Sequence, residues 1–179
     1  MMLFYHYLTK IKVYLMEKIL ILSTGGTLNK YYDPILGQLC VDPTAKALKT
    51  LSEKWYTPLQ IETLIGKDSL EMTQEDRAYL TQTIQKSPYT KILIIHGTDT
   101  MELSAEYISR HIQDKTILFT GAMVPFSLDA TEASANVGFA LGALSQLQQK
   151  GVYIAMHGHC LPYDAITKKR EEGRFVAKF

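Results

Sequence analysis

Two apolar runs, each ending at a glycine turn that carries hydroxyl groups, constrain this chain more than any other feature of its sequence. Residues 19–22 (Ile-Leu-Ile-Leu) are followed by Ser-Thr-Gly-Gly-Thr, and residues 92–95 (Ile-Leu-Ile-Ile) are followed by His-Gly-Thr-Asp-Thr. Neither run alternates apolar with polar residues, which is typical of strands buried on both faces of a parallel sheet. Open α/β sheets bind their ligands at such strand ends, so the two turns predict an active site or a binding site.

Segments typical of strands and of helices alternate along the chain. This alternation predicts a three-layer α/β domain with a mostly parallel sheet, right-handed crossovers and helices on both faces. We expect strands over 18–23, 59–65, 91–96, 116–120 and 152–156, and helices over 43–55, 73–86, 102–112 and 131–149.

Local signals mark where two of these helices begin. Asp42 is a favourable N-cap, and Pro43 would then occupy the first helical position. Thr73 and Asp76 have the spacing of a capping box, with aspartate in place of the usual glutamate or glutamine. Residues 161–179 are more polar, so we expect them to be irregular or to form a short terminal element.

Composition excludes several functional classes. The chain has 179 residues, of which 46% are hydrophobic and 21% charged, and this suits one domain with a full core. A formal net charge of +1 provides no basic surface, so we expect no nucleic-acid partner. Cys40 and Cys160 lie far apart and form neither a disulfide framework nor a metal knuckle, which favours reduced thiols in a cytoplasmic protein.

The first residues of the chain need a separate interpretation. They are apolar and aromatic, but Lys10 and Lys12 follow, which is not the order of a secretory signal. No run approaches the roughly 20 apolar residues of a membrane span, so we expect no membrane partner. We interpret 1–16 as a leader or start-site extension and 17–179 as the domain. A small strand or helix packed on the domain is the alternative for the leader.

Three turns are candidate sites, and each also has a purely structural interpretation. The turn at 24–27 lacks the residues of a P-loop or a dinucleotide site, and a glycine turn that merely ends a strand explains it equally well. The turn at 96–100 is a more specific signal of a site. Asp99 or Thr100 would be enough to cap the following helix, because a cap needs only one side-chain oxygen, so a cap does not explain the whole set of polar residues. Residues 66–69 (Gly-Lys-Asp-Ser) would lie at the same sheet edge, unless they are only a polar loop.

Two polar clusters favour structural interpretations. His157, His159 and Cys160 are metal-ligand types, but alternate strand residues point to opposite faces and no fourth ligand is evident. We therefore expect loop histidines and no metal site. Most of the run at 168–172 (Lys-Lys-Arg-Glu-Glu) is interpreted as solvated surface. Lys168 is the exception, for a reason that follows from the family resemblance described next.

Three motifs resemble the N-terminal domain of the bacterial-type L-asparaginase/glutaminase family. The chain carries Thr-Gly-Gly-Thr from Thr24, His-Gly-Thr-Asp-Thr-Met from His96 and Thr-Gly-Ala-Met from Thr120, in the family's order. The resemblance covers 18–179 and implies a flavodoxin-like domain. The smaller C-terminal domain that normally follows in this family is missing, so we expect a single-domain protein.

The resemblance also implies roles for individual residues. Thr27 would be the nucleophile that attacks a side-chain amide, forms an acyl-enzyme and releases ammonia. Thr98 would assist the activation of Thr27 or of the hydrolytic water. Asp99 would orient the site and bind the α-amino group of the substrate, and Lys168 would pair with Asp99.

Other residues would bind the substrate and stabilise the transition state. By the same resemblance, Asp68 and Ser69 would bind the substrate, Ser69 through the α-carboxylate. Backbone N–H groups at the Gly97 turn and near Ala122 would stabilise an oxyanion, and such donors contribute on the order of 3 kcal/mol each in other hydrolases. A threonine hydroxyl is a weak nucleophile and needs a neighbouring base, a role that a lysine can take. We expect neither a metal nor an organic cofactor.

Two departures from the family pattern matter. The family places a tyrosine on a mobile loop after the nucleophile, but here the loop at 29–37 is short and Pro34 occupies the nearest matching position. Tyr32 or Tyr31 would then supply the phenol. In full-length members the neighbouring subunit's C-terminal domain completes the site, so we expect a homo-oligomer.

Two functions compete on this evidence. The first is an asparaginase-like amidohydrolase that acts on L-asparagine or a related small amide. The alternative is a non-catalytic amino-acid-binding module or sensor that retains the fold and the pocket. A truncated gene product is a third possibility.

Overall fold

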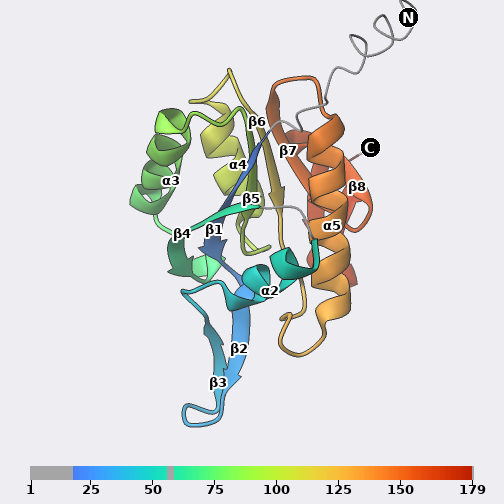
Figure 1. Cartoon of the computed structure of the whole chain (residues 1–179). Helices are drawn as coiled ribbons and strands as arrows, with labels where there is room; N and C mark the ends of the chain where they lie inside the picture. Colours follow the sequence, from blue (N-terminus) through green and yellow to red (C-terminus); the bar gives the residue numbers. More distant parts are fainter. Residues whose placement is uncertain (1–17, 56–58, 179) are drawn as a thin grey trace, which may run out of the picture.

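A six-stranded sheet runs through the centre of the computed structural model, which describes residues 18–55 and 59–178 (Figure 1). Its strand order is β4-β1-β5-β6-β7-β8, and neighbouring strands are parallel except for β7 and β8. The predicted leader at 1–16 lies outside the described residues. The strands of this sheet are β1 (Ile19–Gly25), β4 (Gln60–Lys67), β5 (Lys91–Ile95), β6 (Thr116–Thr120), β7 (Gly151–Met156) and β8 (His159–Pro162).

Helices cover both faces of the sheet. One apolar cluster packs α3 (Gln74–Lys86) and α4 (Met101–Ser109) on one face through residues such as Leu80. A second cluster packs α2 (Lys46–Trp55) and α5 (Ala130–Gln146) on the other face. This arrangement confirms the predicted three-layer, mostly parallel α/β fold. The parallel strands follow the 2-1-3-4-5 order of flavodoxin-like folds.

The strand order reverses at β1, which pairs with β4 on one side and with β5 on the other. Open α/β sheets form a crevice at such a switch point, outside the carboxyl ends of the strands. The two glycine turns follow β1 and β5, so both lie at this crevice. Short 3₁₀ helices η1 (Thr27–Asn29) and η2 (Ser69–Glu71) continue the chain from the ends of β1 and β4.

Two antiparallel hairpins lie outside the main sheet. The first pairs β2 (Lys30–Asp33) with β3 (Gln38–Val41) and projects away from the domain (Figure 1). The second pairs β9 (Ile166–Lys169) with β10 (Arg174–Ala177). The expectation that 161–179 is irregular or a single short element is therefore wrong. Two further 3₁₀ helices are η3 (Tyr163–Ala165) and η4 (Arg170–Glu172).

The two predicted helix starts have different outcomes. The capping box is confirmed, because Thr73 Oγ1 accepts from Asp76 N at 3.2 Å and Asp76 Oδ2 accepts from Thr73 N at 2.9 Å. Pro43 does not open a helix. Asp42 accepts from the N–H of Lys46 at 3.0 Å, but a turn with Ala45 at φ 52° intervenes, so α2 begins at Lys46.

Candidate active site

Three turns meet at the carboxyl ends of β1, β4 and β5, and glycines allow their close approach. Gly26 has φ 77°, and a Cβ atom there would lie 2.3 Å from the nitrogen of Gly97. A Cβ atom on Gly97 would in turn lie 2.6 Å from Ser69 Oγ. The Gly26 N–H also donates to the carbonyl of Lys67 at 3.0 Å. The turn before Thr27, the turn before Thr98 and the turn at Ser69 therefore form one contiguous surface.

Lys168 links this surface to a segment far along the chain. Its Nζ donates to Thr98 Oγ1 at 2.8 Å and to Asp99 Oδ1 at 2.9 Å. The Lys168 side chain is only 10% exposed, so this ion pair is shielded from bulk water. The structure thus brings together the predicted hydroxyl, carboxylate and ammonium groups. The Asp99 carboxylate binds Lys168 rather than capping a helix.

Thr27 begins η1, directly after the Gly26 contact with Gly97. The residue is partly buried, and its hydroxyl makes no hydrogen bond to another described residue. Thr27 follows the glycine turn at the end of β1, so it lies at the switch-point crevice. Among the described residues, the Thr27 hydroxyl therefore has no hydrogen-bond partner that would compete with a ligand.

Arg170 is a second cation on Asp99 that the sequence analysis assigned to solvated surface. Its Nη1 lies 2.8 Å from Asp99 Oδ1, and its Nη2 donates to the Asp99 carbonyl at 3.4 Å. The arginine side chain is 62% exposed, so it borders the site from the solvent side. Both cations use the same carboxylate oxygen of Asp99.

Asp68 and Ser69 form the third part of the surface. Asp68 forms an ion pair with Lys30 and accepts from the N–H of Leu70 at 3.0 Å. Burial opposes ionisation of Asp68, but the hydrogen bonds from Lys30 and Leu70, with the nearby Lys30 and Lys168 charges, hold its pKa below the usual 3.8. Ser69 is buried, and its carbonyl accepts from the Thr100 hydroxyl at 2.7 Å. Thr100 thus ties two turns together instead of capping α4 with its side chain.

His96 fixes the turn between β5 and Thr98. The ring is completely buried, and its Nδ1 donates to the carbonyl of Gly97 at 2.7 Å, since a carbonyl can only accept. Burial lowers the pKa of His96 from 6.5 to about 4, and the charge of Arg77 acts in the same direction. The imidazole is therefore neutral at pH 7 and serves the turn as a structural donor.

Ala122 is buried in the loop that follows β6. Glu132 from α5 holds this loop by accepting from the N–H of Met123 at 2.9 Å and of Val124 at 2.9 Å. His157, which belongs to the predicted histidine cluster, donates to Glu132 at 2.9 Å. In the described ranges, no group of three or more His, Cys, Asp or Glu side chains is arranged to hold a metal ion.

Tyr32 lies apart from these groups. It sits on the β2–β3 hairpin, opposite Leu39, and is 55% exposed. Within the part of the chain that the structure describes, its phenol has no hydrogen bond to Thr27, Thr98 or Lys168. The β2–β3 hairpin that carries Tyr32 points away from the sheet in Figure 1.

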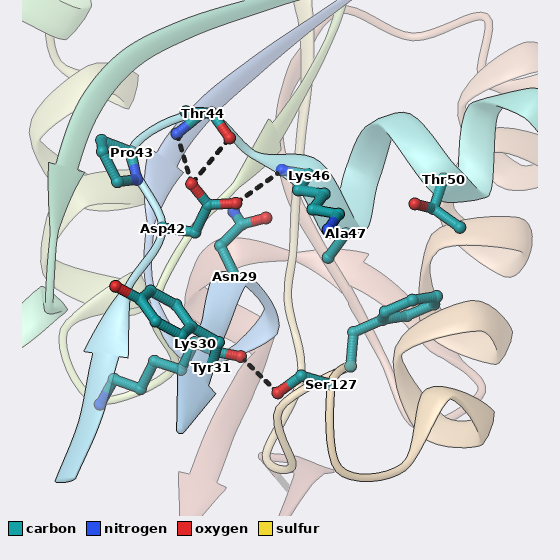
Figure 2. Close-up of a pocket in the computed structure, with 11 residues that line it drawn as sticks. Asn29, Lys30, Tyr31, Asp42, Pro43, Thr44, Lys46, Ala47, Thr50 and Ser127 are labelled. Atoms are coloured by element: carbon teal, nitrogen blue, oxygen red, sulfur yellow. Dashed lines mark hydrogen bonds between the residues drawn. The ribbon is translucent and has the colours of Figure 1, made fainter. Parts of the chain in front are cut away.

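A cavity of about 520 Å³ lies next to this site, between the β2–β3 hairpin, the start of α2 and the loop before α5 (Figure 2). Asn29 and Lys30 line it, and both follow closely on Thr27. Ser127 closes one side by donating to the Lys30 carbonyl at 2.8 Å. Thr27, Thr98, Asp99 and Lys168 are not among its lining residues, so the cavity is distinct from the candidate active site.

Comparison with known proteins identifies the family. A family model described as asparaginase, N-terminal, matches residues 18–174, so the chain belongs to the asparaginase family through that domain. This confirms the family inferred from the three motifs. The structure resembles the thermostable L-asparaginase from Thermococcus kodakarensis, with a TM-score of 0.75 and 23% identity over 89% of this chain and 51% of that one.

Two relatives show how low the sequence identity is and how little of each relative the chain covers. A protein named probable periplasmic L-asparaginase from Haemophilus influenzae is 27% identical over 86% of this chain and 46% of its own length. The human 60 kDa lysophospholipase is 37% identical, but only over 50% of this chain and 15% of its own. The chain thus spans about half, or less, of the length of these relatives.

No helix among the described residues is long and apolar enough to cross a bilayer.

Three residues that contact the site or its supporting segments were not predicted from the sequence: Arg170, Glu132, and Glu102, which accepts from the N–H of Lys168 at 3.0 Å. Arg170 stood inside a mixed charge run, where nothing separates a site residue from a surface one. Glu102 follows the His-Gly-Thr-Asp-Thr-Met motif directly, and its place next to the motif could have marked it as a candidate site residue. Glu132 stands in the first turn of α5 and gives no pattern that would reveal its contact with the loop at Met123.

Proposed function

We propose that this chain hydrolyses the side-chain amide of L-asparagine, or of a related small amide, with Thr27 as the nucleophile. The observation that carries the proposal is the hydrogen bonding of Lys168 to both Thr98 and Asp99, next to the turn that precedes Thr27. Membership of the asparaginase family supports amide chemistry. Because one fold can host several functions, the proposal rests on the site as well as on the family.

The proposed reaction has two steps. Lys168, once it has released one ammonium proton to solvent, takes up the proton of the Thr27 hydroxyl, directly or through the Thr98 hydroxyl, as the Thr27 oxygen attacks the amide carbonyl carbon. The tetrahedral intermediate then breaks its C–N bond, and the nitrogen takes up the proton and leaves as ammonia. Water then attacks the acyl carbon and gives a proton to the same base. The C–O bond to Thr27 breaks, the base returns the proton to the Thr27 oxygen, and the acid leaves.

Charged groups would hold the two ends of an amino-acid amide. Asp99 would bind the α-ammonium group through Oδ2, which has no partner among the described residues. Ser69 would bind the α-carboxylate, and Asp68 would hold the η2 turn and Lys30 in place for it. For the oxyanion, we propose the N–H groups at Gly97 and Ala122, because Glu132 already occupies those of Met123 and Val124.

Assembly and compartment are further parts of the proposal. Because the family resemblance implies a site formed between subunits, we propose that this chain assembles as a homo-oligomer. Sedimentation at micromolar concentration should show more than the monomer, and a monomer alone would contradict this.

Cys40 and Cys160 are free thiols, which supports the reducing cytoplasm as the compartment.

Ammonia release tests the central proposal. The wild type should release ammonia from L-asparagine, L-glutamine or another small amide, and Thr27→Ala and Lys168→Met should not. Circular dichroism and thermal unfolding of both variants would show that they fold. Equal rates for the wild type and Thr27→Ala would reject the proposal.

The exposed position of Tyr32 favours a second candidate, a non-catalytic amino-acid-binding module. Tyr32 makes no hydrogen bond to Thr27 among the described residues, so it gives the proposed nucleophile no phenol partner. This candidate predicts that calorimetry detects L-asparagine or L-aspartate while no amide is hydrolysed. Binding of neither amino acid would contradict both candidate functions.

A further inference from the structure

Lys168 belongs to a hairpin that packs on the core but is not hydrogen-bonded into the central sheet. Among the described strands β9 pairs with β10 alone, as a separate two-stranded sheet, and Ile166 and Phe175 bury the hairpin against the core. A lysine ammonium at the end of a flexible side chain takes one position only if the backbone beneath it is fixed, because ordering such a side chain costs up to about 2 kcal/mol. The contacts that fasten β9 therefore determine how well Lys168 is placed.

Glu102 provides that fastening from the first turn of α4. Its Oε1 accepts from the backbone N–H of Lys168 at 3.0 Å and from the Thr167 hydroxyl at 3.0 Å. Its Oε2 lies 3.2 Å from Lys178 Nζ, beyond the end of β10. One carboxylate thus binds the backbone of the lysine itself, the neighbouring Thr167 in β9 and Lys178 just past the end of β10.

The hydrogen bond from the Lys168 backbone to Glu102 is linked to the candidate site, because Glu102 lies only three positions after Asp99. Asp99 binds the ammonium of Lys168, and Glu102, three positions later, binds the backbone N–H of the same residue. Both acceptors come from the segment that also carries Thr98. Lys168 is therefore held at its main chain and at its tip by a single rigid unit at the start of α4.

The hairpin has a second anchor that does not involve Glu102. Phe175 lies opposite Lys168 in the β9–β10 register and is 1% exposed within the core. The Phe175 N–H donates to His157 Nδ1 at 3.1 Å, and His157 in turn donates to Glu132. A Glu102 variant should therefore keep its hairpin on the domain while losing the fine placement of Lys168.

We propose that Glu102 is a positioning residue that places Lys168 for the amide hydrolysis proposed above, on which this inference rests. The acceptor oxygen, rather than the negative charge, is the feature that matters for the Lys168 backbone. Glu102→Gln keeps an oxygen that can accept from Lys168 N, whereas Glu102→Ala removes it. The two variants thus separate the hydrogen bond from the loss of charge.

Steady-state kinetics provide the first test. Glu102→Ala should lower kcat about tenfold or more with KM changed less than threefold, and Glu102→Gln should stay within about threefold of the wild type. Glu106→Ala is the matched control, because Glu106 lies on the same helix and, among the described residues, forms its ion pair with the exposed Arg110 and not with the hairpin. Wild-type kcat in Glu102→Ala, or equal losses in Glu102→Gln and Glu102→Ala when both fold, would overturn the proposal.

A second readout does not depend on activity. In protein labelled with ¹³Cε-lysine, Lys168→Met assigns the Lys168 resonance. Glu102→Ala should shift and broaden this resonance, and Glu102→Gln should largely preserve it. An unchanged Lys168 signal in Glu102→Ala would overturn the positioning role even if no amide is hydrolysed. Absence of any Thr27-dependent ammonia release would instead overturn the proposed function alone.

Discussion

Lys168 and Thr98 are 70 positions apart in the sequence, yet the Lys168 ammonium donates a 2.8 Å hydrogen bond to the Thr98 hydroxyl. Parallel topology explains half of this relationship, because it collects the ends of β1, β4 and β5 at one edge. The β9–β10 hairpin explains the other half by returning Lys168 to that edge. The candidate active site thus depends on a small accessory element as well as on the central sheet.

The contact between Gly26 and Gly97 predicts a large cost for any side chain at position 26. In Gly26→Ala the Cβ atom would meet the Gly97 nitrogen at 2.3 Å and would also sit at a positive φ. We expect a loss of more than about 2 kcal/mol in the free energy of unfolding, measured by urea denaturation. Gly37→Ala shares the positive φ but has nothing within 4 Å, so it should cost only about 1 kcal/mol. Equal losses in the two variants would show that the turns are not in close contact.

Arg170 predicts an effect on ligand binding rather than on stability. It shares Asp99 Oδ1 with Lys168, so it opposes any ligand ammonium at this carboxylate. Exposed pairs are worth about 0.2–1 kcal/mol, so Arg170→Ala should tighten L-aspartate binding by only about two- to fivefold in calorimetry. Arg174→Ala is the control, since Arg174 pairs with Glu172 away from the site. Weaker binding in Arg170→Ala would show that the arginine binds the ligand directly.

His96 predicts a loss of stability in acid. Its pKa is about 4 in the folded protein and about 6.5 in the unfolded chain, so the unfolded chain binds more protons between these values. The contribution of His96 is complete above pH 6.5 and is lost as the pH falls towards 4, by about 3 kcal/mol in total.

Urea denaturation at several pH values tests this dependence. His96→Asn keeps a neutral donor near the position of Nδ1, so its stability should change less with pH between 6.5 and 4 than that of the wild type. His111→Asn serves as the control, because His111 is exposed. The account fails if the wild type and His96→Asn lose stability in parallel over this range.

The sheet and its two glycine turns were predictable because buried parallel strands leave uninterrupted apolar runs, as at 19–22 and 92–95. The capping box at Thr73 was predictable for a similar reason, since its chemistry is local. Lys168 was predicted only through the resemblance to a family motif. No local pattern connects a lysine near the C-terminus to a turn after β5.

The remaining features depend on contacts that leave no periodic signal. β9 and β10 are four-residue strands that mix charged and apolar side chains, so neither alternation nor an apolar run marks them. The left-handed Ala45 delays the start of α2 although Asp42 and Pro43 are favourable start residues. Glu102 gains its role only because the hairpin returns to α4.

Transfer of the acyl group to hydroxylamine tests the nucleophile most directly. With L-asparagine and hydroxylamine present, the wild type should form the aspartyl hydroxamate, because hydroxylamine attacks the acyl ester on Thr27 in place of water. Thr27→Ala should form none and should release ammonia at least about a thousandfold more slowly. Ammonia release without any hydroxamate, or equal rates in the two proteins, would contradict the assignment of Thr27 as the nucleophile.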